Sequence, residues 1–178
     1  GLIEVASVIV GQVERSVDAW ETQDHAEAAQ VIAGDDEVDF RCKELERMAF
    51  DLVLLQAPKA HDLRLIHTGL IITVALERVG DLAVAIARRV EAMEPSRPIP
   101  EVDALLKRME PRAISALSQS VQAFAREDTG LAIVAKSDAR SVQELLEGVM
   151  QAASHRAADH DIAPWLANAV LLARHLER

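Results

Sequence analysis

Three of the six prolines in this 178-residue chain fall within six residues, at Pro95, Pro98 and Pro100. A proline inside a helix removes a hydrogen bond and clashes with the preceding turn, so no helix can continue through this segment. We therefore interpret residues 95–100 as a linker. It divides the chain into a first unit, residues 1–94, and a second unit, residues 101–178.

Each unit is expected to contain three helices. Asp24 and Asp128 are good N-cap residues, and Pro58 separates two helices because it is poorly tolerated inside one. The third helix is nearly apolar all round, which is typical of a helix packed on several sides. The six predicted helices cover about Ile3–Thr22, Ala26–Gln56, Ala60–Met93, Val102–Arg126, the segment from Asp128 to Ala158, and Pro164 to Arg178.

Composition and an internal repeat both favour an all-α fold. Half of the residues are apolar, yet the chain has only three Phe, two Trp and no Tyr, a composition that suits helix packing better than sheets. The segment 76–78, Leu-Glu-Arg, recurs as 176–178. The spaced pattern in 17–24 recurs, with Phe124 in place of Trp20, in 121–128. The chain is therefore predicted to form two pseudo-symmetric three-helix bundles.

The net charge of −10 argues against binding to nucleic acid or to an anionic lipid surface. Cys42 is the single cysteine, so no disulfide within the chain is possible. The first ten residues lack the basic start of a secretory signal. The most apolar stretch, Thr68–Leu76, is far shorter than the roughly 20 residues of a membrane span. We expect a cytoplasmic protein that meets a membrane only through partners.

Two acidic pairs are the strongest candidates for chemistry: Asp35 with Asp39, and Glu77 with Asp81. Residues four apart share one face of a helix, and like charges so placed repel each other. Each pair therefore needs a compensating cation, which a Lys, an Arg or a metal ion could supply. Oxygen ligands favour hard cations. The alternative is that these acids are solvated surface residues. Glu77 and Asp81 interrupt the most apolar helix, so at least one is expected to be partly shielded.

The chain resembles the PhoU family of phosphate-signalling regulators. The resemblance is carried by Asp62–Ile66, Leu76–Asp81 and Ala85–Ala87, with supporting similarity in Leu55–Pro58 and Val31–Val38. It implies two three-helix bundles related by pseudo-symmetry. It also implies a regulator that links the high-affinity phosphate ABC transporter to a sensor histidine kinase and represses the bacterial phosphate-starvation response.

The resemblance further implies metal ions on acidic helix pairs, including multinuclear iron clusters. By position Asp35, Asp39, Glu77 and Asp81 match the first such set, for iron, magnesium, manganese, zinc or nickel. The pattern departs from the family at Ala75 and Leu82. In the second unit the motif near Asp138 is broken. That unit is expected to be truncated at its C-terminal end, because the chain stops before the motif's final Asp.

We expect a regulatory adaptor rather than an enzyme, acting through the transporter ATPase and the kinase; a homodimer is compatible with this role. Arg126 resembles a family segment at the turn after the fourth helix, where it is either a partner contact or a solvated arginine. The alternative is a metal-binding bundle for storage or sensing, or a carboxylate-bridged metalloenzyme. The enzyme would normally require a Glu-x-x-His motif, and none occurs in the chain.

Overall fold

The computed structural model describes residues 1–156 and 161–178, and almost all of these residues are helical. None of the helices in this part of the chain is both long and apolar enough to cross a membrane. The helices are α1 (Leu2–Thr22), α2 (His25–Ala33), α3 (Asp35–Gln56), α4 (Ala60–Glu91), α5 (Pro100–Arg126), α6 (Thr129–Arg156) and α7 (Ala163–Glu177).

The predicted all-α fold is confirmed, with one difference in the second helix. That helix is divided at Gly34 into α2 and α3, which together count as one bent helix among the six expected. A Cβ atom on Gly34 would lie only 3.2 Å from Nε2 of Gln12, so a larger residue would crowd α1 at this bend. The predicted end of the fifth helix, at Ala158, lies outside the described residues.

The same turn is built twice, once after α1 and once after α5. Gln23 and Glu127 end these helices in the left-handed conformation, at φ 54° and 51°. The next residue, Asp24 or Asp128, accepts two backbone N–H hydrogen bonds at the start of the following helix. Both N-cap predictions are therefore confirmed. The repeated sequence pattern corresponds to a repeated turn, while the exact unit boundaries stay a prediction.

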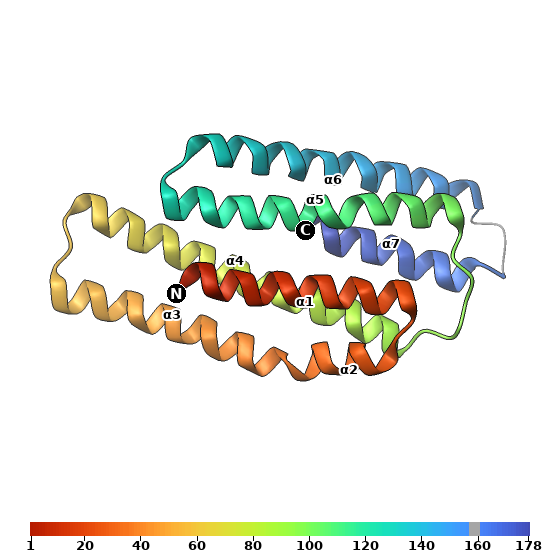
Figure 1. Ribbon diagram of the computed structural model, residues 1–178, viewed down its shortest axis with the longest axis horizontal. Coiled ribbons are helices and arrows are strands. Elements are labelled where there is room, and N and C mark those ends of the chain that lie inside the picture. The colour runs from red at the N-terminus through yellow and green to blue at the C-terminus, as the bar shows by residue number, and fades with distance from the viewer. Residues whose placement is uncertain (157–160) are drawn as a thin grey trace.

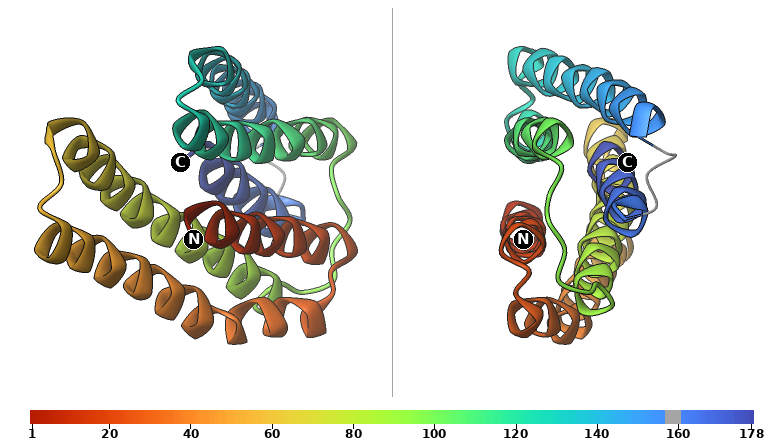
Figure 2. Two further views of the ribbon diagram at one scale, coloured as in Figure 1. Left: turned by 60° about the vertical axis from the view of Figure 1, so that its left-hand side comes forward. Right: turned by 90° about the vertical axis from the view of Figure 1, so that its right-hand side faces the viewer.

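The helices lie roughly along one direction, as Figure 1 shows. The α5–α6 hairpin lies on one side, the α3–α4 hairpin on the other, and α7 lies between them (Figures 1 and 2). The α3–α4 hairpin projects past the start of α1. At its tip Phe50, Leu54 and Leu55 are exposed, at 65%, 75% and 82%. The expectation that the third helix packs on several sides holds only for the C-terminal part of α4, because Leu63 and Ile71 are exposed.

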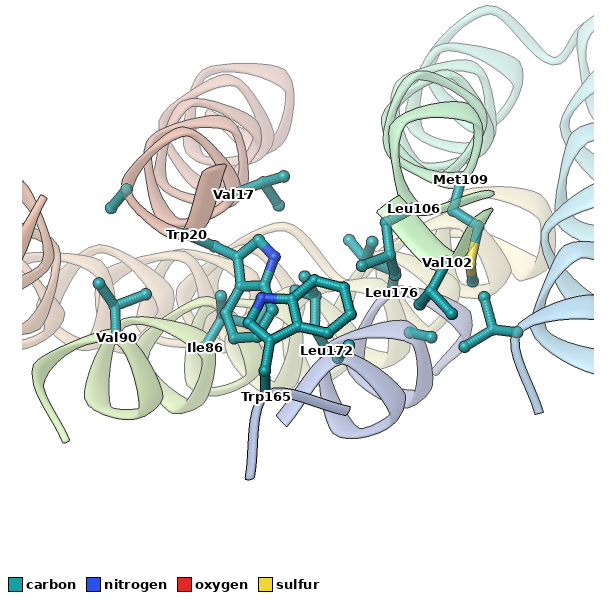
Figure 3. Close-up of a cluster of buried hydrophobic side chains, with 14 of the residues drawn as sticks. Val17, Trp20, Ile86, Val90, Val102, Leu106, Met109, Trp165, Leu172 and Leu176 are labelled. Atoms are coloured by element: carbon teal, nitrogen blue, oxygen red, sulfur yellow. The ribbon is translucent and has the colours of Figure 1, made fainter. Parts of the chain in front are cut away.

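One hydrophobic core runs through both halves of the chain. Trp20 of α1 and Trp165 of α7 are both buried, and their rings lie 6.0 Å apart between centroids at an angle of 39°. Figure 3 shows this pair between the buried side chains of α4 and α5. Neither half buries its apolar face alone, so the two halves stabilise each other.

Polar contacts also tie the linker and the last helix to the first half. The side chain of Gln23 donates to the carbonyl of Ser96 (2.7 Å) and accepts from its N–H (3.3 Å), which ties the linker to the end of α1. Between the halves, Nε of Arg89 on α4 donates to Nε2 of His175 on α7, at 3.4 Å. Burial, and then the charges of Arg89 and Arg178, lower the pKa of His175 below its ordinary value of 6.5.

Replacing Trp165 with alanine should remove one of the two tryptophans that join the halves. We expect a loss of about 3–5 kcal/mol in the free energy of unfolding, measured by urea denaturation. Phe50→Ala, which also removes an aromatic ring but from an exposed position, should change stability by less than about 0.5 kcal/mol. Equal losses in the two variants would contradict the assignment of the shared core.

Stability should fall on acidification because of His175. The folded protein favours the neutral imidazole, while the unfolded chain accepts a proton near the ordinary pKa. The contribution of His175 is therefore complete above that pKa and is lost as pH falls through the lower folded value. Urea midpoints at roughly pH 7.5 and 5.5 should differ more for the wild type than for His175→Asn. An identical difference in both proteins would be inconsistent with this role.

Candidate functional site

The four acids of the predicted metal site lie along the seam between α3 and α4. Asp35 and Asp39 belong to the first turns of α3, and Glu77 and Asp81 belong to α4. The two helices approach closely here, because a Cβ atom on Gly80 would lie 3.2 Å from Cγ1 of Val38. Val38 and Gly80 sit between the members of the two pairs, so their contact brings the pairs together.

The charges of neighbouring carboxylates act on Asp35. The pKa of Asp35 is raised, first by partial burial and then by the charges of Asp39 and Asp81; Arg88 acts in the opposite direction. Glu77 lies farther along the seam, beside Cys42. We refer to Asp35, Asp39, Glu77 and Asp81 as the acidic row.

Cys42 is a buried residue of α3 on the same seam. Burial raises the pKa of its thiol to about 11, and the charges of Glu77 and Asp39 add to this effect. Glu77 itself is half-buried, whereas Asp81 is exposed. The prediction that at least one acid of this pair is shielded therefore holds for Glu77.

Two cations of the protein partly compensate the acidic row. Nζ of Lys43 lies 3.6 Å from Oδ2 of Asp39. Arg88 lines the same shallow hollow as Asp35 and Asp81, together with Asn168 of α7. Lys43 follows Asp39 by four residues and Arg88 follows Asp81 by seven, so both could have been found from helical spacing. Lys43 and Arg88 therefore supply part of the positive charge that is needed to compensate the repulsion between these acids.

The row is not a formed metal cage. Within residues 1–156 and 161–178, no three His, Cys, Asp or Glu side chains are grouped as they would be around a metal ion. The oxygen donors suit a hard cation in chemistry, but they are not grouped around one point. Metal binding by Asp35, Asp39, Glu77 and Asp81 therefore stays a prediction.

One polar residue near the seam was missed from the sequence. Gln12 of α1 is only 6% exposed, and in the described part of the chain its Oε1 finds no hydrogen-bond partner. Its amide lies against Gly34 and Gly80, the residues directly before Asp35 and Asp81. A lone glutamine gives no sequence signal of such a position.

The remaining predicted residues lie apart from the acidic row. Asp138, in the second half, accepts hydrogen bonds from Oγ of Ser115 (2.6 Å) and from Nη1 of Arg112 (3.2 Å), so it joins α5 to α6. Arg126 is exposed at the end of α5. Its exposure is compatible with both readings of this residue, a partner contact or a solvated arginine.

Comparison with known proteins gives one consistent likeness. A family profile described as the PhoU domain matches residues 2–90. A phosphate-specific transport system accessory protein PhoU homolog from Xylella fastidiosa is 29% identical over 78% of this chain and 58% of its own length. The homolog from Caulobacter vibrioides is 31% identical over 79% of this chain and 61% of its own length. The chain thus spans about three-fifths of the length of these relatives.

Solved structures show the same fold. The crystal structure of PhoU from Pseudomonas aeruginosa superposes with a TM-score of 0.89 at 24% identity, over 99% of this chain and 85% of the other. The phosphate transport system regulatory protein PhoU from Streptococcus pneumoniae also gives 0.89, at 19% identity over 99% and 83%. At these identities the likeness establishes the arrangement of helices.

The repulsion within the acidic row can be measured as stability. Asp35→Asn removes a charge that Asp39 and Asp81 disfavour, whereas Asp36→Asn removes an exposed charge from the same first turn of α3. Both variants lose the same favourable interaction with the helix N-terminus. We therefore expect Asp35→Asn to be more stable than Asp36→Asn by roughly 0.2–0.5 kcal/mol near neutral pH, in metal-free urea denaturation. The reverse order would show that the row is not crowded with charge.

Proposed function

This chain belongs to the PhoU family, and we propose that it acts as a regulatory adaptor in bacterial phosphate sensing. The observation that carries the proposal is the PhoU domain match over residues 2–90, in a chain whose whole described length has the PhoU fold. The relatives are named as accessory proteins of the phosphate-specific transport system. An accessory role in phosphate transport is therefore the best-supported function.

In this role the protein couples the phosphate ABC transporter ATPase to a sensor histidine kinase and represses the starvation response. It works by protein–protein contact in the cytoplasm and catalyses no reaction. Related proteins are named as accessory or regulatory, which supports this choice. Arg126 is the proposed contact residue, because it is exposed where α5 turns into α6 and has a long, charged side chain suited to interfaces.

The acidic row is the proposed cation site of the adaptor. Asp35, whose pKa the charges of Asp39 and Asp81 raise, would hold the ion together with these two acids once their side chains turn toward it, and Glu77 would extend the site along the seam. A hard cation such as iron, magnesium or manganese supplies positive charge that cancels this repulsion. Lys43 and Arg88 compete for the same carboxylates, so metal affinity depends on how easily these two side chains move away.

Partner binding can be tested by pull-down of the transporter ATPase and the kinase from the same organism. The wild type should capture at least one of them when phosphate is plentiful. Arg126→Glu should weaken capture by about tenfold or more, the loss that a single interface arginine commonly causes. Arg108→Glu makes the same charge change at an exposed site nearer the other end of α5 and should bind as the wild type does. Failure to bind either partner, with or without phosphate, would refute the adaptor role.

Metal binding can be tested by elemental analysis of protein purified without chelator. The double variant Glu77→Ala with Asp81→Ala should lose most of the bound metal. The double variant Asp36→Ala with Glu37→Ala removes two exposed acids from α3 and should keep it. Equal metal content in both would show that the acidic row is not the site. Metal binding without any capture of either partner would favour the alternative, a metal-storing or metal-sensing bundle.

A further inference from the structure

The shallow hollow beside the acidic row brings together charged side chains of both signs, and we call it the polar hollow. It has a volume of about 510 Å³ and lies between the start of α3, the C-terminal part of α4 and the first half of α7. Helix α7 packs against α4 (Figure 2). The polar residues that line the hollow are Asp35, Asp81, Arg88, Arg89 and Asn168. The rest of the lining consists of small apolar residues of α4, namely Val84, Ala85 and Ala92.

The two arginines have hydrogen-bond donors left for a ligand. Arg88 is exposed, and within residues 1–156 and 161–178 it makes no hydrogen bond or ion pair. Nε of Arg89 donates to Nε2 of His175, which orients the guanidinium group. The two terminal nitrogens of Arg89 have no hydrogen-bond partner in the same part of the chain. Paired N–H donors of a guanidinium group are well suited to the oxygens of phosphate.

The position of the arginines on α4 has a simpler explanation, which covers only part of the arrangement. Both lie in the last turn of α4, where the helix dipole stabilises positive charge. The dipole does not explain why Asp35 of α3 and Asn168 of α7 line the same hollow, because these residues belong to other helices. Three separate elements therefore contribute polar groups to one surface.

Asp81 and Arg88 share a face of α4 because they are seven residues apart. Their Cα atoms lie about 10 Å apart along the helix axis. The structure contains no ion pair between them among the described residues. A small ion between the long arginine side chain and the short carboxylate can contact both.

The polar hollow offers donors and acceptors together. The guanidinium groups donate, as does the amide of Asn168, which uses one N–H for the carbonyl of Pro164 (3.1 Å) and keeps a second. The carboxylates of Asp35 and Asp81 accept. Inorganic phosphate near neutral pH keeps one hydroxyl, so it can accept hydrogen bonds from arginine and donate one to a carboxylate. Sulfate and the dianion of a phosphate monoester have no hydroxyl, so the carboxylates only repel them.

We propose that the polar hollow binds inorganic phosphate. Arg88, Arg89 and Asn168 donate to its oxygens, and Asp81 accepts a hydrogen bond from its hydroxyl. The binding site follows from the side chains that line the hollow, while its use as a direct phosphate sensor rests on the proposed function. In that role the adaptor itself responds to phosphate.

The test is equilibrium dialysis of radiolabelled inorganic phosphate against the full chain, with EDTA present so that no metal ion links phosphate to the acidic row. In roughly 0.15 M salt the distant negative charges of the protein are screened beyond about 8 Å. The wild type should bind phosphate saturably, with a Kd below about 1 mM. Sulfate and glycerol 3-phosphate should compete about tenfold more weakly or worse than unlabelled phosphate.

Three variants assign the binding to the polar hollow. Arg88→Gln should weaken phosphate binding by about tenfold or more, because it removes a charged pair of donors. Arg78→Gln makes the same change at an exposed position of α4 outside the hollow and should leave the Kd within about twofold. Asp81→Asn replaces an acceptor by an amide that can also donate, so it should reduce the preference for phosphate over sulfate.

Any of five results would overturn the proposal. They are the absence of saturable phosphate binding, binding that requires added magnesium, equal affinities of Arg88→Gln and the wild type, equal competition by sulfate and phosphate, and an unchanged preference for phosphate in Asp81→Asn. If Arg88→Gln does not fold by circular dichroism, Asn168→Ala tests the same hollow.

Pull-down of the transporter ATPase and the kinase separates this inference from the proposed function. Capture of either partner by a wild-type protein that binds no phosphate would reject the polar hollow and leave the adaptor role intact. Phosphate binding that Arg88→Gln weakens, without capture of either partner, would support the polar hollow and reject the adaptor role.

Discussion

The burial of apolar side chains from both halves in one core is the interaction on which the rest of the structure depends. Trp20 comes from the first helix and Trp165 from the last, and each covers apolar surface that its own half leaves open. Small residues around this pair allow close helix packing with few aromatic rings. Because the halves fold onto each other, the seam between α3 and α4 is held in place by a frame to which both halves contribute.

The same packing positions the carboxylates of the acidic row. Contact between Val38 and Gly80 holds α3 and α4 so close that carboxylates from both helices share one edge. Such crowding costs stability, and Lys43 and Arg88 offset only part of the cost. Because the fold holds like charges together against their repulsion, a cation placed beside them would lower the energy of the site. This response is the physical basis of the proposed cation binding.

The sequence alone determined the features that depend on neighbours in the chain. Proline positions marked the linker, Asp24 and Asp128 marked helix starts, and the spacing of the acid pairs placed each pair on one helix face. Only the tertiary structure decided the features that depend on helices approaching from elsewhere. The bend at Gly34 beside Gln12, the partial burial of Glu77 but not of Asp81, and the exposed first half of α4 belong to this second group. Local patterns fix which face of a helix is apolar or charged, but which neighbour covers that face, and how closely, is set by long-range packing.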